Sequence, residues 1–357
     1  MDKLSNYLDE IFKKAKQKPL TVKGRIAFIK SIAILVDQTP TDLSFLRKEK
    51  LVLTRILDSP NVLTQYNRLC HVVKTIELDK SCVSKKTLNR YTSMLRKLKP
   101  EKIAIETDNR LTDDQKARYL TLGQVKAFLG KGLNDLFEEY GFTKRVVTEE
   151  DINRLKAVTN RKELNIYNFG KRFQQLAIMS CYVYQPALRN NFGLMKTTFQ
   201  KKTALTDTEY NYYYIDRRNK KTFIIMNNYK NVAYMGKGFL IEVDKRLQNV
   251  MTNWLELLRF IVPDLEYIFY YSISSDGKVK HSNNMSTIGR TIPRIFEKYT
   301  GQPLSINDLR HIHEIAIQKS DVYKNATVAE REKIHAMLLH GHLTGIRYNL
   351  LWHEESK

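Results

Sequence analysis

Five residues of this chain have side chains of the types that attack by a tyrosine on a phosphodiester would need. Arg310 and His340 precede Tyr348, which lies near the end of the sequence. Arg189 and Lys230 lie upstream of them. A tyrosine can attack a phosphodiester only where cations surround the phosphorus and a proton donor serves the leaving oxygen. Two arginines, a lysine, a histidine and a tyrosine therefore make a set that could transfer a phosphoryl group to Tyr348.

Each of these residues also has an ordinary structural interpretation. Arg189 follows an apolar helix and could be a surface arginine at a helix junction. Lys230 could be a solvated hairpin lysine, and Lys237 competes with it on the next strand. His340 could belong to an ordinary helix cap, and Tyr348 could be a half-buried helix tyrosine. The hypothesis depends on the joint order and spacing of these residues.

The residues around Arg310 predict a helix with two different faces. Leu309 and Ile312 point one way on that helix, while Arg310 and His313 point elsewhere. The functional interpretation is a phosphate clamp with a histidine one turn away. His311 and His313 could instead bind a metal ion, but no cysteine or second histidine pair lies nearby at helical spacing. We therefore expect no metal and no other cofactor.

The balance of charge predicts a polyanionic partner. The chain has 357 residues, with 60 Lys+Arg against 38 Asp+Glu and a formal net charge of +22. Basic residues spread through folded-looking segments favour phosphate contacts with nucleic acid, here double-stranded DNA. An anionic membrane is the competing partner, but we find no transmembrane run, signal peptide or basic amphipathic membrane helix. Three cysteines without regular spacing indicate a reducing, intracellular compartment.

The first hundred residues predict helices. Apolar residues at positions 4, 7, 8, 11 and 12 fall on one helical face, within an N-terminal segment 1–40 that could bind an arm site or a partner. Residues 41–105 contain several short helical patterns and predict a compact, basic helical domain. Its candidate DNA-binding residues are Lys85, Lys86, Arg90 and Lys97. Pro100 opens a polar stretch without apolar periodicity, which predicts a linker that we place at 106–116.

The rest of the chain predicts a mostly α fold with a small antiparallel sheet (α+β). A helix over 163–184 ends at Gln185-Pro186, because proline cannot continue the hydrogen-bond ladder. Three aromatic and β-branched runs, separated by turn-like residues, predict antiparallel strands at 211–215, 222–226 and 238–243. Helices are expected on both sides of these strands in the sequence. A small sheet within helices, after a separate helical domain, is an architecture typical of an enzyme.

With these motifs in this order, residues 40–357 resemble the tyrosine recombinase (integrase) family. The resemblance implies a helical core-binding domain and a catalytic domain, here residues 117–357, that together form a clamp around DNA. In chain order, it assigns the first arginine, the hairpin lysine, the second arginine, the histidine of a Leu-Gly-His-Ser box and the nucleophile to Arg189, Lys230, Arg310, His340 and Tyr348.

Several positions depart from the family's pattern. The box around the second arginine usually reads His-x-x-Arg, and this chain has Asn307 at the histidine position. Asparagine can hydrogen-bond a phosphate oxygen but cannot relay a proton. Phe192 stands where the family usually has a glutamate after the first arginine. The spacing from His340 to Tyr348 is one residue shorter than is common, so His342 is an alternative for the active-site histidine.

The resemblance implies a site-specific recombinase that cleaves and rejoins DNA through a 3′-phosphotyrosyl intermediate, without ATP or metal. We expect a homo-tetramer on DNA, because strand exchange between two duplexes uses four active sites. Abundant lysine, asparagine and tyrosine fit the AT-rich DNA of many viruses and mobile elements. Integration of such DNA, in a nucleus, cytoplasm or viral factory, is therefore the expected role. A type IB topoisomerase or a telomere resolvase would use the same chemistry, and a DNA-binding protein that has lost catalysis is the alternative from another class.

Overall fold

The computed structural model divides the chain into two compact units, each described here by itself. Unit 1 is Met1–Asn109 and unit 2 is Arg110–Lys357, so the boundary falls within the predicted linker 106–116. The structure describes residues 2–15, 19–36, 40–107, 113–158, 164–262, 265–273, 279–280 and 286–339.

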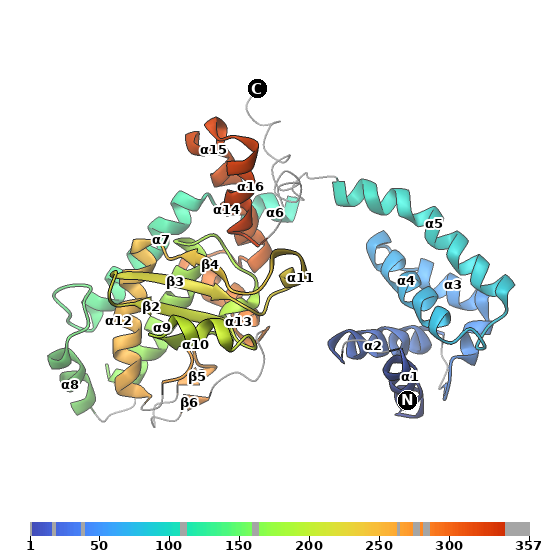
Figure 1. The fold of residues 1–357 in the computed structure, drawn as a ribbon, viewed down its shortest axis with the longest axis horizontal. Coiled ribbons are helices and arrows are strands. Elements are labelled where there is room, and N and C mark those ends of the chain that lie inside the picture. Colours follow the sequence, from blue (N-terminus) through green and yellow to red (C-terminus); the bar gives the residue numbers. More distant parts are fainter. Residues whose placement is uncertain are drawn as a thin grey trace. The chain divides into compact units, whose positions relative to one another are not determined.

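Unit 1 is built around a single hydrophobic core. Its described elements are the helices α1 (Asp2–Lys14), α2 (Pro19–Leu35), η1 (Ser44–Arg47), α3 (Glu49–Leu57), α4 (Val62–Leu78) and α5 (Lys85–Thr107) (Figure 1). Leu8 of α1 is fully buried in the same core as Val72 of α4 and Tyr91 of α5. The apolar stripe of α1 needs such a cover to leave water. The N-terminal segment 1–40, expected as a separate module, therefore shares its core with 41–105.

Helix α5 continues through Pro100 to Thr107, so the polar stretch after Pro100 was wrongly predicted to be non-helical up to that residue. A proline inside a helix removes one backbone hydrogen bond, but the Glu, Lys, Ile and Ala residues that follow it tolerate the helix. The Lys102 ammonium also lies 5.3 Å from the centroid of the Tyr66 ring on α4. This cation–π contact ties the last turns of α5 to the rest of unit 1.

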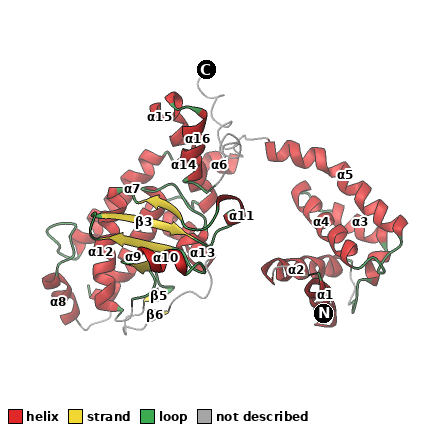
Figure 2. Cartoon of the chain, in the orientation of Figure 1, coloured by secondary structure: helices red, strands yellow, loops and turns green. Residues whose placement is uncertain are grey.

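Unit 2 contains the strands of the chain among further helices (Figure 2). Its helices are α6 (Asp113–Arg118), α7 (Leu122–Glu139), α8 (Glu149–Ala157), α9 (Ile166–Val183), η2 (Asn190–Phe192), α10 (Lys201–Thr206), α11 (Val232–Met235), α12 (Lys245–Ile261), α13 (Ser286–Thr300), α14 (Ile306–Lys319), α15 (Asp321–Asn325) and α16 (Val328–Ala336). Its strands are β1 (Lys196–Thr198), β2 (Tyr212–Asp216), β3 (Lys221–Met226), β4 (Phe239–Glu242), β5 (Ser272–Ile273) and β6 (Val279–Lys280). The chain is thus mostly helical with a small sheet, as an α+β class predicts.

The main sheet is mixed rather than antiparallel. Strands β2, β3 and β4 pair in antiparallel register, with Ile224 of β3 between Tyr213 and Ile241. These strands coincide with the three predicted ones. Strand β1 adds a fourth, which runs parallel to β2 with Thr197 opposite Tyr213. The antiparallel prediction missed β1 because three residues are too few for an alternating pattern to stand out.

Both faces of the sheet are covered, which explains why consecutive tyrosines of β2 are all buried. Tyr213 and Ile224 face the main core of unit 2, which is formed largely by α7, α9, α12 and α13. Tyr212 and Ile225 face the other way and pack with Ala204 of α10. Within the described ranges, none of the helices has both the length and the hydrophobicity to cross a membrane.

Candidate active site

Arg310, the second predicted arginine, lies in the interior of unit 2. Helix α14 begins with a capping box, in which Ser305 accepts from the amide of Asp308 and the Asp308 carboxylate accepts from the amide of Ser305. Arg310 follows on the first turns and is 1% exposed. Its Nη1 donates to the carbonyl of Ala187 at 2.7 Å, and its Nη2 donates to the carbonyl of Leu338 at 2.9 Å. The guanidinium therefore joins two backbone segments that are far apart in sequence.

Arg189, the first predicted arginine, lies two residues beyond one of those carbonyls. It is half-exposed and precedes the short helix η2. Its carbonyl accepts from the hydroxyl of Tyr182 at 2.9 Å, which fixes the backbone against the end of α9. Its guanidinium has no hydrogen-bonding or ion-pair partner among the residues that the structure describes. A backbone held in place and a side chain left available suit a residue that grips an incoming anion.

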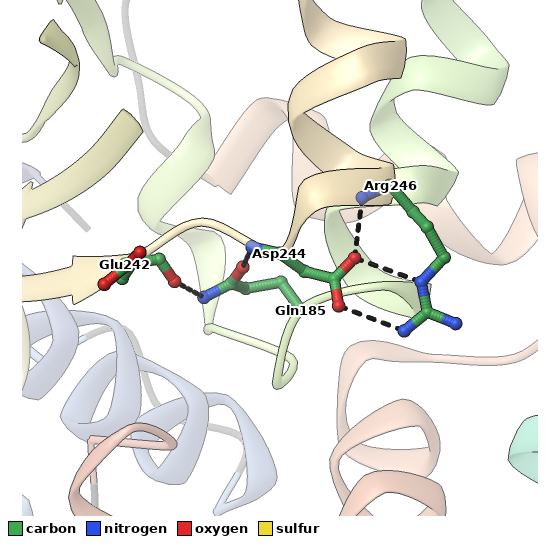
Figure 3. Close-up of polar contacts among 4 residues, drawn as sticks. All are labelled: Gln185, Glu242, Asp244 and Arg246. Carbon is green, nitrogen blue, oxygen red and sulfur yellow. Dashed lines mark hydrogen bonds and ion pairs between the residues drawn. The ribbon is translucent and has the colours of Figure 1, made fainter. Parts of the chain in front are cut away.

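Gln185 fixes the start of the Arg189 segment, as Figure 3 shows. Its side-chain amide donates to the carbonyl of Glu242 at 3.2 Å and accepts from the amide of Asp244 at 3.1 Å. The Asp244 carboxylate in turn accepts from the backbone and the guanidinium of Arg246. Hydrogen bonding to Arg246 holds the pKa of Asp244 below its usual value. The junction of β4 and α12 is thereby tied to the segment that carries Arg189.

Lys230 lies in the turn between β3 and α11, four residues past the end of β3. Two asparagines build this turn. Asn211 accepts through its Oδ1 from the amides of Asn227 and Asn228, at 2.9 and 2.8 Å. The buried side chain of Asn227 donates to the carbonyl of Ala204 at 2.7 Å and accepts from the amide of Gly238. Lys230 itself is exposed, without a hydrogen bond or ion pair to any described residue.

The segments of Arg189, Lys230 and Arg310 meet one another and the residues just ahead of His340. Asn191 donates to the carbonyl of Asn228 at 3.3 Å, which connects the Arg189 segment to the Lys230 turn. Asn231 donates to the carbonyl of Leu339 at 2.8 Å, which connects the Lys230 turn to the end of the described chain. Together with the two bonds of Arg310, these contacts bring four separate stretches of sequence together.

The remaining predicted residues at the carboxyl end are not described. His340, His342 and Tyr348 all lie outside the described residues, which end at Leu339. Leu339 itself has a backbone φ of 55°. The left-handed region is uncommon for a residue with a bulky side chain. The chain therefore makes a strained turn directly ahead of His340.

The predicted accessory residues that the structure describes differ in exposure and in their contacts. Asn307 is exposed on the first turn of α14. Lys237, the rival of Lys230, donates to the hydroxyl of Thr208 at 2.9 Å. His313 is buried, and its Nε2 lies 2.8 Å from the carbonyl of Tyr182. Burial lowers the pKa of His313 to about 4, so the imidazole is neutral at pH 7 and serves as a support between α14 and α9.

A buried polar network between α14 and α16 was missed in the sequence. His335 Nδ1 lies 2.8 Å from the carboxylate of Glu314, and its Nε2 lies 2.9 Å from the hydroxyl of Tyr323. Gln318 donates to the same carboxylate at 2.8 Å. The network holds α16 against α14 and so determines where the following Leu338 carbonyl lies. No spacing rule in the sequence could single out His335, because its partners come from two other helices.

A cavity of about 630 Å³ lies elsewhere in unit 2, between α9, β5 and α13. Its lining includes Lys171 and Arg294. No residue that lines it belongs to the four segments that meet at Arg310. The cavity and the four segments therefore share no residue, although Gly289 of α13 packs against Asn190, next to Arg189.

The predicted DNA-binding residues of unit 1 lie on the exposed side of α5. Lys85, Lys86 and Lys97 are exposed, and Arg90 is exposed but forms an ion pair with Glu49 at 2.9 Å. Between Lys85 and Lys99 the helix has no acidic residue. The apolar residues of the same stretch, such as Tyr91, face the core of unit 1. The outer face of α5 thus presents cations with little local compensation.

Comparisons with known proteins identify no relative. No family model matches this chain, and searches of curated proteins and of solved structures find no significant match. The function of the chain must therefore be inferred from its own residues and their geometry.

Proposed function

We propose that this chain cleaves and rejoins DNA strands through a tyrosine, in the manner of a tyrosine recombinase. The proposal takes Tyr348 as the nucleophile and Arg189, Arg310, Lys230 and His340 as the residues that serve the phosphate. Tyr348 forms a bond to phosphorus, and the bond from phosphorus to the 5′ oxygen breaks. Lys230 gives a proton to the departing oxygen, and His340 helps to take the proton of the tyrosine. The phosphotyrosine conserves the bond energy, so no ATP is required.

The observation that supports the proposal most is the meeting of four segments at Arg310. The types and the order of these residues say nothing about the distances between them. Hydrogen bonds nevertheless join Ala187, near Arg189, with Leu338, near His340, through one guanidinium. The bond from Asn231 to Leu339 adds the Lys230 turn to the same place. The segments that carry the proposed catalytic residues Arg189, Lys230 and Arg310 are therefore in contact with one another through hydrogen bonds.

Two exposed cations and the net charge fit a DNA substrate. Arg189 and Lys230 are the cations of this set that are accessible to an incoming phosphate. The formal net charge of +22 and the outer face of α5 provide the additional attraction that a long polyanion needs. In the proposed reaction, duplex DNA is the partner, four copies of the chain act on two duplexes, and integration of mobile or viral DNA is the outcome.

The burial of Arg310 supports a second candidate function. A guanidinium that is 1% exposed and bonded to two carbonyls is not open to a phosphate. For catalysis, the cover of Arg310 has to open when DNA binds. A DNA-binding protein that has lost catalysis would have no such need, and Asn307 at the family's histidine position agrees with that alternative. Formation of a covalent adduct distinguishes the two functions.

The test is a trapping assay with nicked duplex DNA, whose cleaved strand diffuses away and prevents religation. Wild-type protein should give a denaturant-resistant adduct without added metal, and Tyr348→Phe should give none. Tyr271→Phe is the matched control, because Tyr271 is 59% exposed and distant in sequence from the site. Salt-sensitive binding with no adduct would favour the inactive DNA-binding protein. An active protein that relaxes supercoils but exchanges no strands would be a type IB topoisomerase.

A further inference from the structure

The turn at Leu338 and Leu339 is held by two side chains from other parts of unit 2. Arg310 donates to the Leu338 carbonyl, and Asn231 donates to the Leu339 carbonyl. Leu339 has a positive φ of 55°, a conformation that persists only where the surroundings enforce it. The two donors are therefore part of what keeps the chain in this conformation ahead of His340.

The side chain of Asn231 does not cap the helix that it precedes. It occupies the N-cap of α11, where an asparagine normally accepts a hydrogen bond from the first turn of its own helix. No such cap bond is formed. Its amide nitrogen instead reaches the carbonyl of Leu339, 108 positions away in sequence, at 2.8 Å. The capping interaction of α11 is thus replaced by a tertiary contact.

We propose that Asn231 is a positioning residue, which fixes the turn of Lys230 against the turn that precedes His340. This inference rests on the proposed function. Lys230 is the neighbour of Asn231 in sequence, so the hydrogen bond from Asn231 to Leu339 fixes the backbone that carries Lys230. Asn231 touches neither DNA nor the reacting atoms. It acts through the lysine that protonates the leaving oxygen.

The chemistry of the leaving group allows this role to be measured. With a normal substrate, the 5′ oxygen leaves as an alcohol and requires the proton of Lys230. When sulfur replaces that bridging oxygen, the thiolate leaves without a proton, because thiols are far more acidic than alcohols. A defect in the placement of Lys230 should therefore become much smaller with the sulfur substrate. A general loss of folding or of DNA binding would persist with both.

The experiment compares single-turnover adduct formation by the full chain on the two substrates. Asn231→Ala should slow cleavage of the oxygen substrate about 100-fold, the scale of an ångström-sized misplacement. With the sulfur substrate the loss should shrink to about 10-fold or less, while DNA affinity stays unchanged. Asn231→Asp, which replaces the donor by an acceptor, should be at least as impaired. Asn219→Ala is the control, because the bonds of Asn219 to described residues are to Asp216 in the β2–β3 turn.

The strain at Leu339 provides a second comparison. Glycine adopts a positive φ readily, so Leu339→Gly should make the turn less dependent on its donors. The effect of Asn231→Ala on the oxygen substrate should therefore be smaller in the Leu339→Gly background than in the wild type. Equal effects in both backgrounds would mean that Asn231 does not act through this turn.

Amide hydrogen exchange separates failure of this inference from failure of the proposed function. If wild-type protein forms no adduct on any substrate, the proposed function is lost, but the contact can still be judged. Asn231→Ala should accelerate exchange at the amides around Leu339 about 10-fold or more, and Asn219→Ala should not. Unchanged exchange, or equal loss of cleavage on the oxygen and sulfur substrates, would overturn the positioning role.

Discussion

At the scale of single residues, the candidate site is held together by side chains that donate to backbone carbonyls. Arg310, Gln185, Asn227 and Asn231 each bond to main-chain oxygens of a different segment. A buried carbonyl that loses its donor costs about 1–3 kcal/mol. These residues therefore stabilise the positions of their neighbours, whereas Arg189 and Lys230 remain available for a ligand.

The same substitution should affect stability very differently at the two arginines. Arg310→Met should lower the free energy of unfolding by about 3–5 kcal/mol, because it leaves two buried carbonyls without donors. Arg189→Met should change it by about 0.5 kcal/mol or less, since that side chain is half-exposed, but should reduce adduct formation at least about 10²-fold. Urea unfolding and the trapping assay measure the two effects. Equal loss of stability in both variants would contradict the assigned difference.

His313 should make the stability of unit 2 sensitive to mild acid. Its pKa is about 4 in the folded protein and near 6.5 in the unfolded chain. Because the folded pKa is depressed, the stabilisation is complete above about pH 6.5 and is lost as the pH falls toward 4. Between pH 7 and pH 5 the loss should be about 2 kcal/mol.

Unfolding in urea at the two pH values tests this expectation. His313→Gln, which retains a donor for the Tyr182 carbonyl, should remove most of the difference. His311, the other described histidine of unit 2 whose pKa is lowered, contributes in the same direction. An unchanged pH dependence in His313→Gln would therefore assign the effect to His311 instead.

The sequence could suggest some site residues and not others. Arg189, Lys230 and Arg310 could be selected because the order of their residue types fits a known chemistry. Asn231, His335 and Glu314 could not, because their partners come from distant elements, and asparagine, histidine and glutamate occur at many positions without such roles. Lys230 was expected at the end of a strand and lies in the following turn, since residues 227–230 are shaped by asparagine side chains rather than by strand pairing.

At the scale of elements, the candidate site is positioned by helices that end close to it. Helix α9 is buried along most of its length and stops at Val183, so the Arg189 segment emerges from the interior of unit 2. Helix α16 is held to α14 by the His335 network and stops at Ala336. Rigid elements that end close together position loop residues more precisely than long loops could.

Helix α1 should contribute to the stability of unit 1 as an integral element. Leu8 is fully buried against other helices, so Leu8→Ala should lower the free energy of unfolding of unit 1 by about 2–5 kcal/mol. The exposed Glu10 on the same helix gives the matched control, and Glu10→Ala should have little effect. Urea unfolding of the full chain provides the measurement. A detachable N-terminal module would leave unit 1 unaffected by either substitution.

Strands with several alternating residues were predicted correctly, and strands of two or three residues were missed. The strands at 211–215, 222–226 and 238–243 were evident from aromatic and β-branched runs. Strands β1, β5 and β6 have only three or two residues each, which is too short for any period. The helix across Pro100 was missed because the cost of one proline is offset by contacts with α4, which the sequence does not reveal.

At the scale of the whole molecule, the excess of positive charge is the property most relevant to a partner. The net charge of +22 is distributed over both units, and α5 presents part of it on one exposed face. Affinity for DNA that arises from such contacts falls steeply with salt, because each phosphate contact releases bound counterions.

Individual lysines of α5 should contribute measurably to that salt dependence. Lys86→Ala and Lys97→Ala should each weaken DNA binding and reduce the slope of log affinity against log salt by about 1. Lys13→Ala is a matched control, because Lys13 is exposed but already paired with Asp9 at 2.6 Å. Titration of a labelled duplex at several salt concentrations gives the slopes. If the three variants share the wild-type slope, α5 is not the DNA-contacting face.

The use of backbone carbonyls as acceptors around Arg310 has a consequence for how this site can vary between related chains. Every residue carries a carbonyl, so Ala187, Leu338 and Leu339 could be replaced by other residues without loss of the bonds that they accept. Only the donors, chiefly Arg310, Asn191 and Asn231, need a particular side chain. The hydrogen bonds that build the site would therefore require a particular residue type at only a few positions of the sequence. A pattern built from those donors and their spacing is the form in which distant relatives should be sought.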